Sequence, residues 1–120
     1  MPEIVLLTEP IDPETLARLV RDGFGDMVKF VADLERGVVA AGGDLHADAE
    51  ELLLGQGSTQ KDLWGANYYP GRPREECVEF TSLINIRPSQ GNPSMEITDS
   101  STRARVRELA YKLIGEGGAL

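Results

Sequence analysis

The segment of the sequence most suggestive of chemistry places two carboxylates and the only histidine at alternate positions. Asp44, His46 and Asp48 follow a pair of glycines, and Glu50 comes next. Carboxylate and imidazole groups bind divalent transition metals, and a bound metal can activate water for hydrolysis. One interpretation is therefore a divalent-metal site at Asp44, His46 and Asp48. The other is that Asp48 and Glu50 stabilise a helix N-terminus through its dipole, with Asp44 or His46 as the cap.

A second candidate site lies in the segment INIRPSQGNPS at residues 84–94, where neutral hydrogen-bonding side chains surround one arginine. Such a loop can hold a carboxylate or a phosphate, because a guanidinium group makes bidentate contacts with either. A strand at residues 63–69 adds one further amide. The residues predicted to bind a ligand are Asn67, Asn85, Arg87, Ser89, Gln90 and Asn92. The competing interpretation is that Asn, Ser, Gly and Pro are ordinary turn formers.

Several other chemistries are excluded or disfavoured. No serine lies in a G-x-S-x-G turn, which excludes an α/β-hydrolase. The formal net charge of −8 disfavours binding to nucleic acids and to anionic membranes. No apolar run is long enough to span a bilayer, and the N-terminal residues lack the pattern expected of a signal peptide. The lone Cys77 cannot form an internal disulfide. We therefore expect a soluble cytoplasmic protein.

The elements that would position these residues can be assigned from the apolar pattern. The N-terminal half predicts a strand at residues 3–7 and a helix that Asp12 caps, with Pro13 at its first position and Gly23 at its end. A hairpin follows, with strands at residues 27–34 and 38–41 and Gly37 in the turn. A second helix is predicted at residues 47–54.

The C-terminal half predicts strands at residues 63–69 and 76–86, a long irregular loop at residues 87–98, and a helix that starts near Asp99 and ends at Gly115. The order is β-α-β-β-α-β-β-α. This order predicts an α+β fold, a mainly antiparallel sheet of about five strands with helices on one face. Residues 1–120 are expected to form a single domain, with residues 115–120 frayed.

Three segments also carry a resemblance. They are GGDLHADAE at residues 42–50, LWGANYYP at residues 63–70 and INIRPSQGNPS at residues 84–94. In the same order along nearly the whole chain, they resemble the recurring segments of a family of short prokaryotic proteins that is catalogued as a domain of unknown function. The resemblance implies a stand-alone domain of about this length. It implies no reaction and no ligand.

Three functions remain open from the sequence. The first is a small intracellular module that binds a small molecule or a protein partner through a polar pocket at residues 84–94. The second is a metal-assisted hydrolase in which Asp44, His46 and Asp48 hold the ion and Arg87 holds an anionic substrate. The third is a structural adaptor that assembles as a homo-oligomer, with a homodimer as its simplest form.

Overall fold

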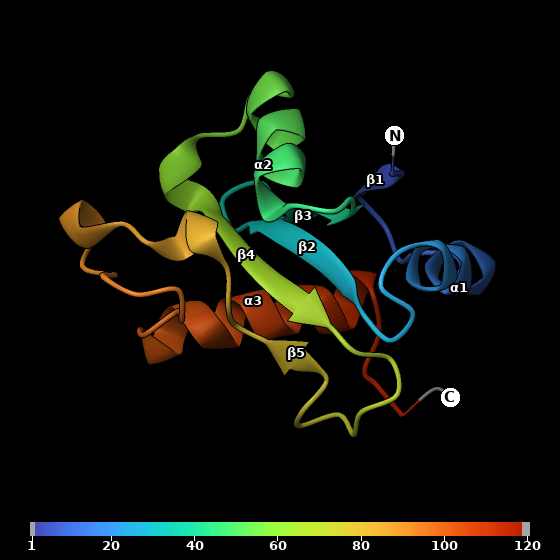
Figure 1. Ribbon diagram of the computed structural model, residues 1–120. Helices are drawn as coiled ribbons and strands as arrows, with labels where there is room; N and C mark the ends of the chain where they lie inside the picture. The colour runs from blue at the N-terminus through green and yellow to red at the C-terminus, as the bar shows by residue number, and fades with distance from the viewer. Residues whose placement is uncertain (1, 119–120) are drawn as a thin grey trace.

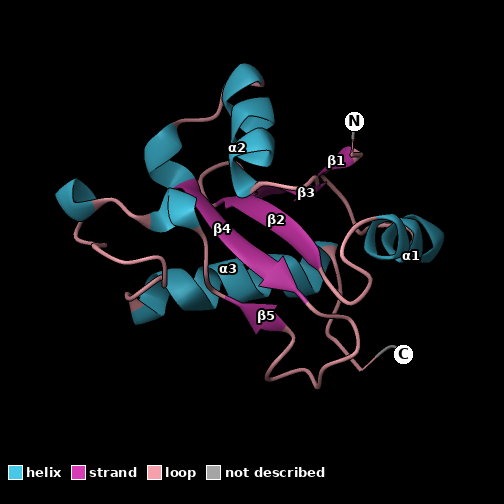
Figure 2. Ribbon diagram, in the orientation of Figure 1, coloured by secondary structure: helices cyan, strands magenta, loops and turns pink. Residues whose placement is uncertain are grey.

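The computed structural model describes residues 2–118, which fold into three α-helices and one five-stranded antiparallel sheet. The strands lie in the order β1-β3-β2-β4-β5 (Figures 1 and 2). The strands are β1 (Ile4–Leu7), β2 (Val28–Asp33), β3 (Val38–Gly42), β4 (Leu63–Tyr68) and β5 (Val78–Glu79), and the helices are α1 (Pro13–Asp22), α2 (His46–Gly55) and α3 (Ser100–Leu113). The predicted α+β class, the element order and the antiparallel five-stranded sheet are confirmed.

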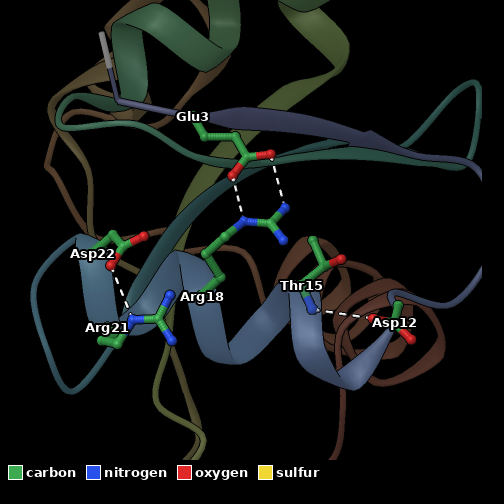
Figure 3. Close-up of polar contacts among 6 residues, drawn as sticks. All are labelled: Glu3, Asp12, Thr15, Arg18, Arg21 and Asp22. Carbon is green, nitrogen blue, oxygen red and sulfur yellow. Dashed lines mark hydrogen bonds and ion pairs between the residues drawn. The ribbon is translucent and has the colours of Figure 1, made fainter.

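Helix α1 begins where the sequence predicts. The Asp12 side chain accepts hydrogen bonds from the backbone amides of Glu14 and Thr15, both at 3.2 Å. The helix is also tied to the start of β1, because the Arg18 guanidinium donates two hydrogen bonds to the Glu3 carboxylate, at 2.9 and 3.0 Å (Figure 3). A bidentate pair of this kind fixes direction as well as distance, so α1 is held against the edge of the sheet.

The hairpin of β2 and β3 is closed by a buried aspartate. Asp33 accepts hydrogen bonds from the amides of Glu35 and Arg36, and from the Ser58 hydroxyl at 2.6 Å. Gly37 has a φ of 68°, a conformation that glycine adopts without steric cost. The predicted hairpin is therefore confirmed. The bond from Ser58 also ties the end of α2 to the turn.

The helices cover both faces of the sheet, and the prediction of helices on one face is wrong. Leu53 of α2 packs with Val31, Ala40 and Leu63 on one face. The other face buries a larger set of side chains under α3 and α1, including Phe30, Ala32, Val39, Ala41, Trp64, Tyr68, Val106 and Leu113. Successive strand residues are therefore apolar on both sides, because neither face of the central strands meets water.

The strand predicted at residues 76–86 is also shorter than expected. β5 pairs with β4 only through Val78 and Glu79, and the chain then turns into a short 3-10 helix at Leu83–Asn85. Ser82 caps that helix, since its side chain accepts a hydrogen bond from the Ile84 amide. The apolar alternation that suggested one long strand places Val78 and Phe80 in the core, but leaves Ile86 exposed.

The C-terminal residues that were expected to fray are held in place as far as the structure describes them. The Gly117 amide donates to the Tyr68 hydroxyl at 2.9 Å, and the Gly118 amide donates to the Arg72 carbonyl at 2.7 Å. Residues 119 and 120 lie outside the described residues. Within residues 2–118, every helix is too short or too polar to cross a membrane.

Two adjacent leucines of α2 provide a test of its packing. Leu53 is 0% exposed and Leu54 is 40% exposed. Removing buried methyl groups leaves a cavity, so we expect Leu53→Ala to lower the free energy of unfolding by about 2–5 kcal/mol. Leu54→Ala should lower it by less than about 1 kcal/mol. Urea unfolding followed by circular dichroism measures both values, and equal losses would contradict the observed orientation of α2.

Candidate functional site

The structure separates the residues of the predicted metal site. Asp44 and Asp48 are exposed, whereas His46 is buried at the first position of α2. No group of three or more His, Cys, Asp or Glu side chains within residues 2–118 is arranged to hold a metal ion. Neither Asp44 nor His46 caps the helix, because the N-cap residue is Leu45 and no side chain of the described residues accepts a bond from the first turn.

His46 instead faces the sheet. Its Nε2 lies 2.7 Å from the carbonyl oxygen of Ala66 in β4. A carbonyl can only accept a hydrogen bond, so Nε2 carries the proton and Nδ1 is an acceptor in the neutral ring. Burial lowers the pKa of His46, and the nearby charge of Lys29 lowers it further, against the opposing effects of the bond to Ala66 and of the neighbouring Asn67 side chain. The ring is therefore neutral at pH 7.

The side-chain amides of Asn85 and Asn92 connect the 84–94 loop to neighbouring segments of the backbone. Asn85 is fully buried and pairs with the backbone of Gly65 in β4, whose amide donates to Oδ1 and whose carbonyl accepts from Nδ2, both at 2.9 Å. Nδ2 also donates to the Met95 carbonyl. Asn92 is buried as well: it donates to the carbonyls of Asn85, Ser94 and Glu96, and it accepts two bonds from Thr98.

The remaining residues predicted for this loop lie beside its outer turn. Arg87 donates to the carbonyls of Gln60 and Leu63, and its guanidinium lies 4.2 Å from the centre of the Trp64 ring. Gln90 donates to the Lys61 carbonyl, and Ser89 is exposed. Arg87 binds the carbonyl of Leu63 and His46 binds that of Ala66. These two residues are three positions apart on β4, or about 10 Å, so the two side chains contact different parts of the strand.

The structure contains a cavity of about 340 Å³ where the N-terminus of α2 meets β2, β4 and the 81–95 segment. We call it the His46 cavity. Its lining combines apolar side chains with a few polar ones. The lining residues are Met27, Lys29, Leu45, His46, Ala47, Asn67, Thr81, Ser82, Leu83, Ile84 and Met95. Two residues that the sequence assigned to separate sites, His46 and Asn67, thus lie in one cavity, and Arg87 does not.

Asn67 is held rigidly within the cavity floor. It lies opposite Glu79 in the β4–β5 register, and its Nδ2 donates to Glu79 Oε1 at 2.8 Å. The same oxygen accepts from the Tyr69 hydroxyl at 3.3 Å. These bonds fix the orientation of the amide. Asn67 is 6% exposed, and its Oδ1 has no hydrogen-bond partner among residues 2–118. A buried polar atom in this state costs free energy that a ligand donor would recover.

A second hollow of about 280 Å³ lies between α1 and the Gly42-Gly43 turn. Its polar lining is of mixed charge, with Glu3, Asp22 and Asp44 beside Arg18 and Lys29. Arg18 is already paired with Glu3, as Figure 3 shows. Carboxylates around a glycine turn repel a phosphate, so this hollow does not form a phosphate-binding loop.

The cavity residues that sequence reasoning missed include Lys29 and the apolar rim. Leu45, Leu83 and Met95 are 57%, 70% and 40% exposed, and each precedes or interrupts a polar stretch. Their signal in the sequence was a large apolar residue in a polar setting: Leu45 and Met95 lie in polar segments, and Leu83 lies among the largely polar odd positions of the strand predicted at residues 76–86. Lys29 gave a signal too, because it is the only charged residue among the apolar residues 27–32 of the predicted strand.

The structural role of Asn85 leads to the first prediction for this region. Asn85→Asp replaces the donor Nδ2 by an oxygen and sets it against the buried Gly65 carbonyl and the partly buried Met95 carbonyl. We expect a loss of about 3 kcal/mol or more in the free energy of unfolding. The exposed Ser89→Ala, in the same loop, should stay within about 0.5 kcal/mol of the parent. Urea unfolding compares them, and a fully stable Asn85→Asp protein would show that the amide is not structural.

A second prediction concerns the pH dependence of stability. Because the pKa of His46 is lowered in the folded state, the unfolded chain binds this proton first as the pH falls below about 6.5. The contribution is fully present above that pH and is lost as the pH falls towards the folded pKa. We expect the urea midpoint to drop between about pH 7.5 and about pH 5, before the carboxylates titrate. His46→Gln keeps an N–H donor and should flatten the dependence; an equal drop in both proteins would assign it to other groups.

The comparisons with known proteins give a family but no function. A search of curated proteins finds no match, and a search of solved structures finds none. One family model, described as "Protein of unknown function (DUF5674)", matches residues 5–113, from β1 to the last residue of α3. The matched range includes every residue of the His46 cavity. The expected resemblance to an uncharacterised family is thereby confirmed, and the chain belongs to the DUF5674 family of proteins of unknown function.

Proposed function

We propose that this protein is a binding module for a small molecule, and that the ligand occupies the His46 cavity. The observation that carries the proposal is the exposed apolar rim of Leu45, Leu83 and Met95 around a floor of buried polar groups. Ligand sites in proteins are concave and mainly apolar, with a few polar groups that fix orientation. A volume of about 340 Å³ falls at the small end of their range.

The rim supports the proposal because its apolar side chains remain exposed in the folded protein. Leu83 and Met95 come from the segment that leaves the sheet after β5, and Leu45 comes from the residue before α2. Contiguous exposed apolar side chains edged by polar residues mark binding surfaces, whereas scattered ones do not. Methionine adds adaptability, since its unbranched side chain fits apolar ligands of different shapes.

The floor supports the proposal through its rigidity. Asn67 is oriented by Glu79, and His46 is oriented by the Ala66 carbonyl. The pair presents acceptor atoms, Oδ1 of Asn67 and Nδ1 of neutral His46, whose positions are fixed before any ligand arrives. Preorganised polar groups of this kind give a ligand its orientation without an ordering cost. The exposed Ser89 and the occupied amides of Asn85 and Asn92 offer no comparable arrangement.

The methionines provide the test. Met27 and Met95 both line the cavity, and the third methionine, Met1, lies outside the described residues. With the methionine methyl groups labelled with carbon-13, we expect fragment-sized amphipathic molecules to shift the Met27 and Met95 signals in a saturable way. Leu83→Ala should weaken that binding by roughly 5- to 20-fold, because it removes apolar contact area from the rim.

Leu54→Ala is the matched control, since Leu54 is an exposed leucine of α2 that does not line the cavity. It should leave the affinity unchanged. The proposal fails if no member of a fragment panel shifts the two methionine signals. It also fails if Leu83→Ala and Leu54→Ala have the same effect on every fragment that does.

A further inference from the structure

The two polar residues on the floor of the His46 cavity use their donor groups inside the protein. Asn67 Nδ2 donates to Glu79 at 2.8 Å, and His46 Nε2 donates to the Ala66 carbonyl at 2.7 Å. Reversing the Asn67 amide would set its oxygen against the Glu79 carboxylate, and moving the ring proton of His46 would set a lone pair against the Ala66 carbonyl. Each residue therefore offers a ligand one acceptor, Oδ1 of Asn67 or Nδ1 of His46.

The two acceptors lie close together. His46 is bound to the carbonyl of Ala66, the residue next to Asn67 on β4, and the Asn67 side chain is near enough to influence the pKa of His46. Asn67 is 6% exposed, and its Oδ1 has no hydrogen-bond partner among residues 2–118. An unpaired buried acceptor raises the free energy of the protein without ligand, and a donor on a ligand removes that cost.

The groups around the cavity disfavour ligands of either charge. A carboxylate would set its oxygens against the two acceptors of the floor, and no hydrogen bond would form between them. A cation finds no carboxylate among the described residues that line the cavity, and the lining includes Lys29, whose positive charge repels it. The Lys29 ammonium lies 5.2 Å from the centre of the Phe24 ring, which belongs to the neighbouring hollow. Its effect on a ligand is therefore one of charge rather than of direct contact.

We propose that the ligand of the His46 cavity is a neutral molecule that carries a hydrogen-bond donor, an N–H or O–H group, on an apolar body. This inference rests on the proposed function and names its ligand class. The donor group binds Asn67 Oδ1 and His46 Nδ1, and the apolar body lies against Leu45, Leu83 and Met95. A primary amide has two N–H groups, one for each acceptor, and is a simple group that satisfies both.

Two probes of equal size separate the donor from the apolar contact. Hexanamide ends in an amino group, and methyl pentyl ketone has a methyl group in its place, with the same chain and the same carbonyl. Each is titrated into the full-length protein while the Met27 and Met95 methyl signals are observed. We expect hexanamide to bind about tenfold more tightly, the factor that one or two hydrogen bonds provide. If the ketone binds as well as hexanamide or better, the proposal of a donor is overturned while the binding function stands.

Two charged probes, hexanoate and hexylammonium, test whether the ligand is neutral. We expect each to bind at least about tenfold more weakly than hexanamide. The anion meets two acceptors, and the cation meets the charge of Lys29 without a carboxylate in the described lining. If either ion binds as tightly as hexanamide or more tightly, the neutral ligand is overturned, and the binding function again stands.

The imidazole reports the contact directly. His46 is the one histidine of the chain, so its ring nitrogen signals are unique. With nitrogen-15 in the ring, we expect hexanamide to shift the Nδ1 signal, because a lone pair that accepts a hydrogen bond differs electronically from a free one. The shift should saturate together with the methionine shifts. An Nδ1 signal that stays unchanged while the methionine signals saturate would overturn the proposal.

Substitution of the two acceptors completes the test. His46→Gln keeps a donor for the Ala66 carbonyl and has no acceptor where Nδ1 lies, and Asn67→Leu removes Oδ1 at similar volume. Each should lower the preference for hexanamide over the ketone by about three- to tenfold and leave the affinity for the ketone nearly unchanged. Equal weakening of both probes would show that the residue is only structural and would overturn the proposal. If Asn67→Leu does not fold, His46→Gln decides the result.

Gln56→Leu is the matched control, because it replaces an exposed side-chain amide at the end of α2, outside the cavity, by leucine. It should leave the preference for hexanamide unchanged, and a loss equal to that of His46→Gln would contradict the role of the floor. If none of the four probes moves the methionine signals, both this inference and the binding function proposed for the cavity are contradicted for ligands of this size.

Discussion

The rest of the structure depends on one pairing, in which the Asn85 side chain takes the place of a strand. β5 covers the edge of β4 only at Asn67 and Tyr68, and Gly65, which faces Val31 of β2 on one side, has no strand on the β5 side. The Asn85 amide donates to the Gly65 carbonyl and accepts from the Gly65 amide, as a neighbouring strand would. A side chain reaches further than a backbone, so the chain can leave the sheet after β5. It rises over the face that α2 only partly covers, and the cavity wall forms there.

Gly65 is required by the same pairing. A Cβ atom at this position would lie 2.6 Å from the Ser82 side chain and 3.1 Å from Ile84. The approach of Ser82 and Ile84 to the sheet therefore needs a residue without a side chain, as close approach of two chains often does. Both residues line the His46 cavity, so the same close contact that seals the edge of β4 also sets the depth of the site. Stability and site geometry cannot be varied separately here.

Local signals in the sequence were enough to predict the elements, but not their arrangement. The Asp12 cap, the Gly37 turn and the start of the last helix near Asp99 each depend on a few residues, and each was predicted correctly. The placement of α2 and α3 on opposite faces depends on which apolar residues of the central strands face which helix. Where both faces of a strand are buried, apolar and polar residues no longer alternate, so the sequence does not show which residue lies on which face. The end of β5 depends on Asn85 finding Gly65, a contact across 20 residues. The roles of the predicted site residues depend on contacts of the same long range, since Asn85 and Asn92 bind backbone groups and His46 binds the Ala66 carbonyl.

The position of Lys29 shows why one residue decides the charge of the cavity. Side chains alternate along a strand, so only Lys29, Val31 and Asp33 of β2 reach the α2 face. Val31 is buried in the core under α2, and Asp33 accepts hydrogen bonds from the hairpin turn and from Ser58. Position 29 is thus the only place on β2 from which a charge can enter the cavity. A carboxylate there would join the acidic side chains of the neighbouring hollow around Glu3, Asp22 and Asp44. A lysine there instead places a positive charge at the boundary between the two hollows, since Lys29 lines both of them.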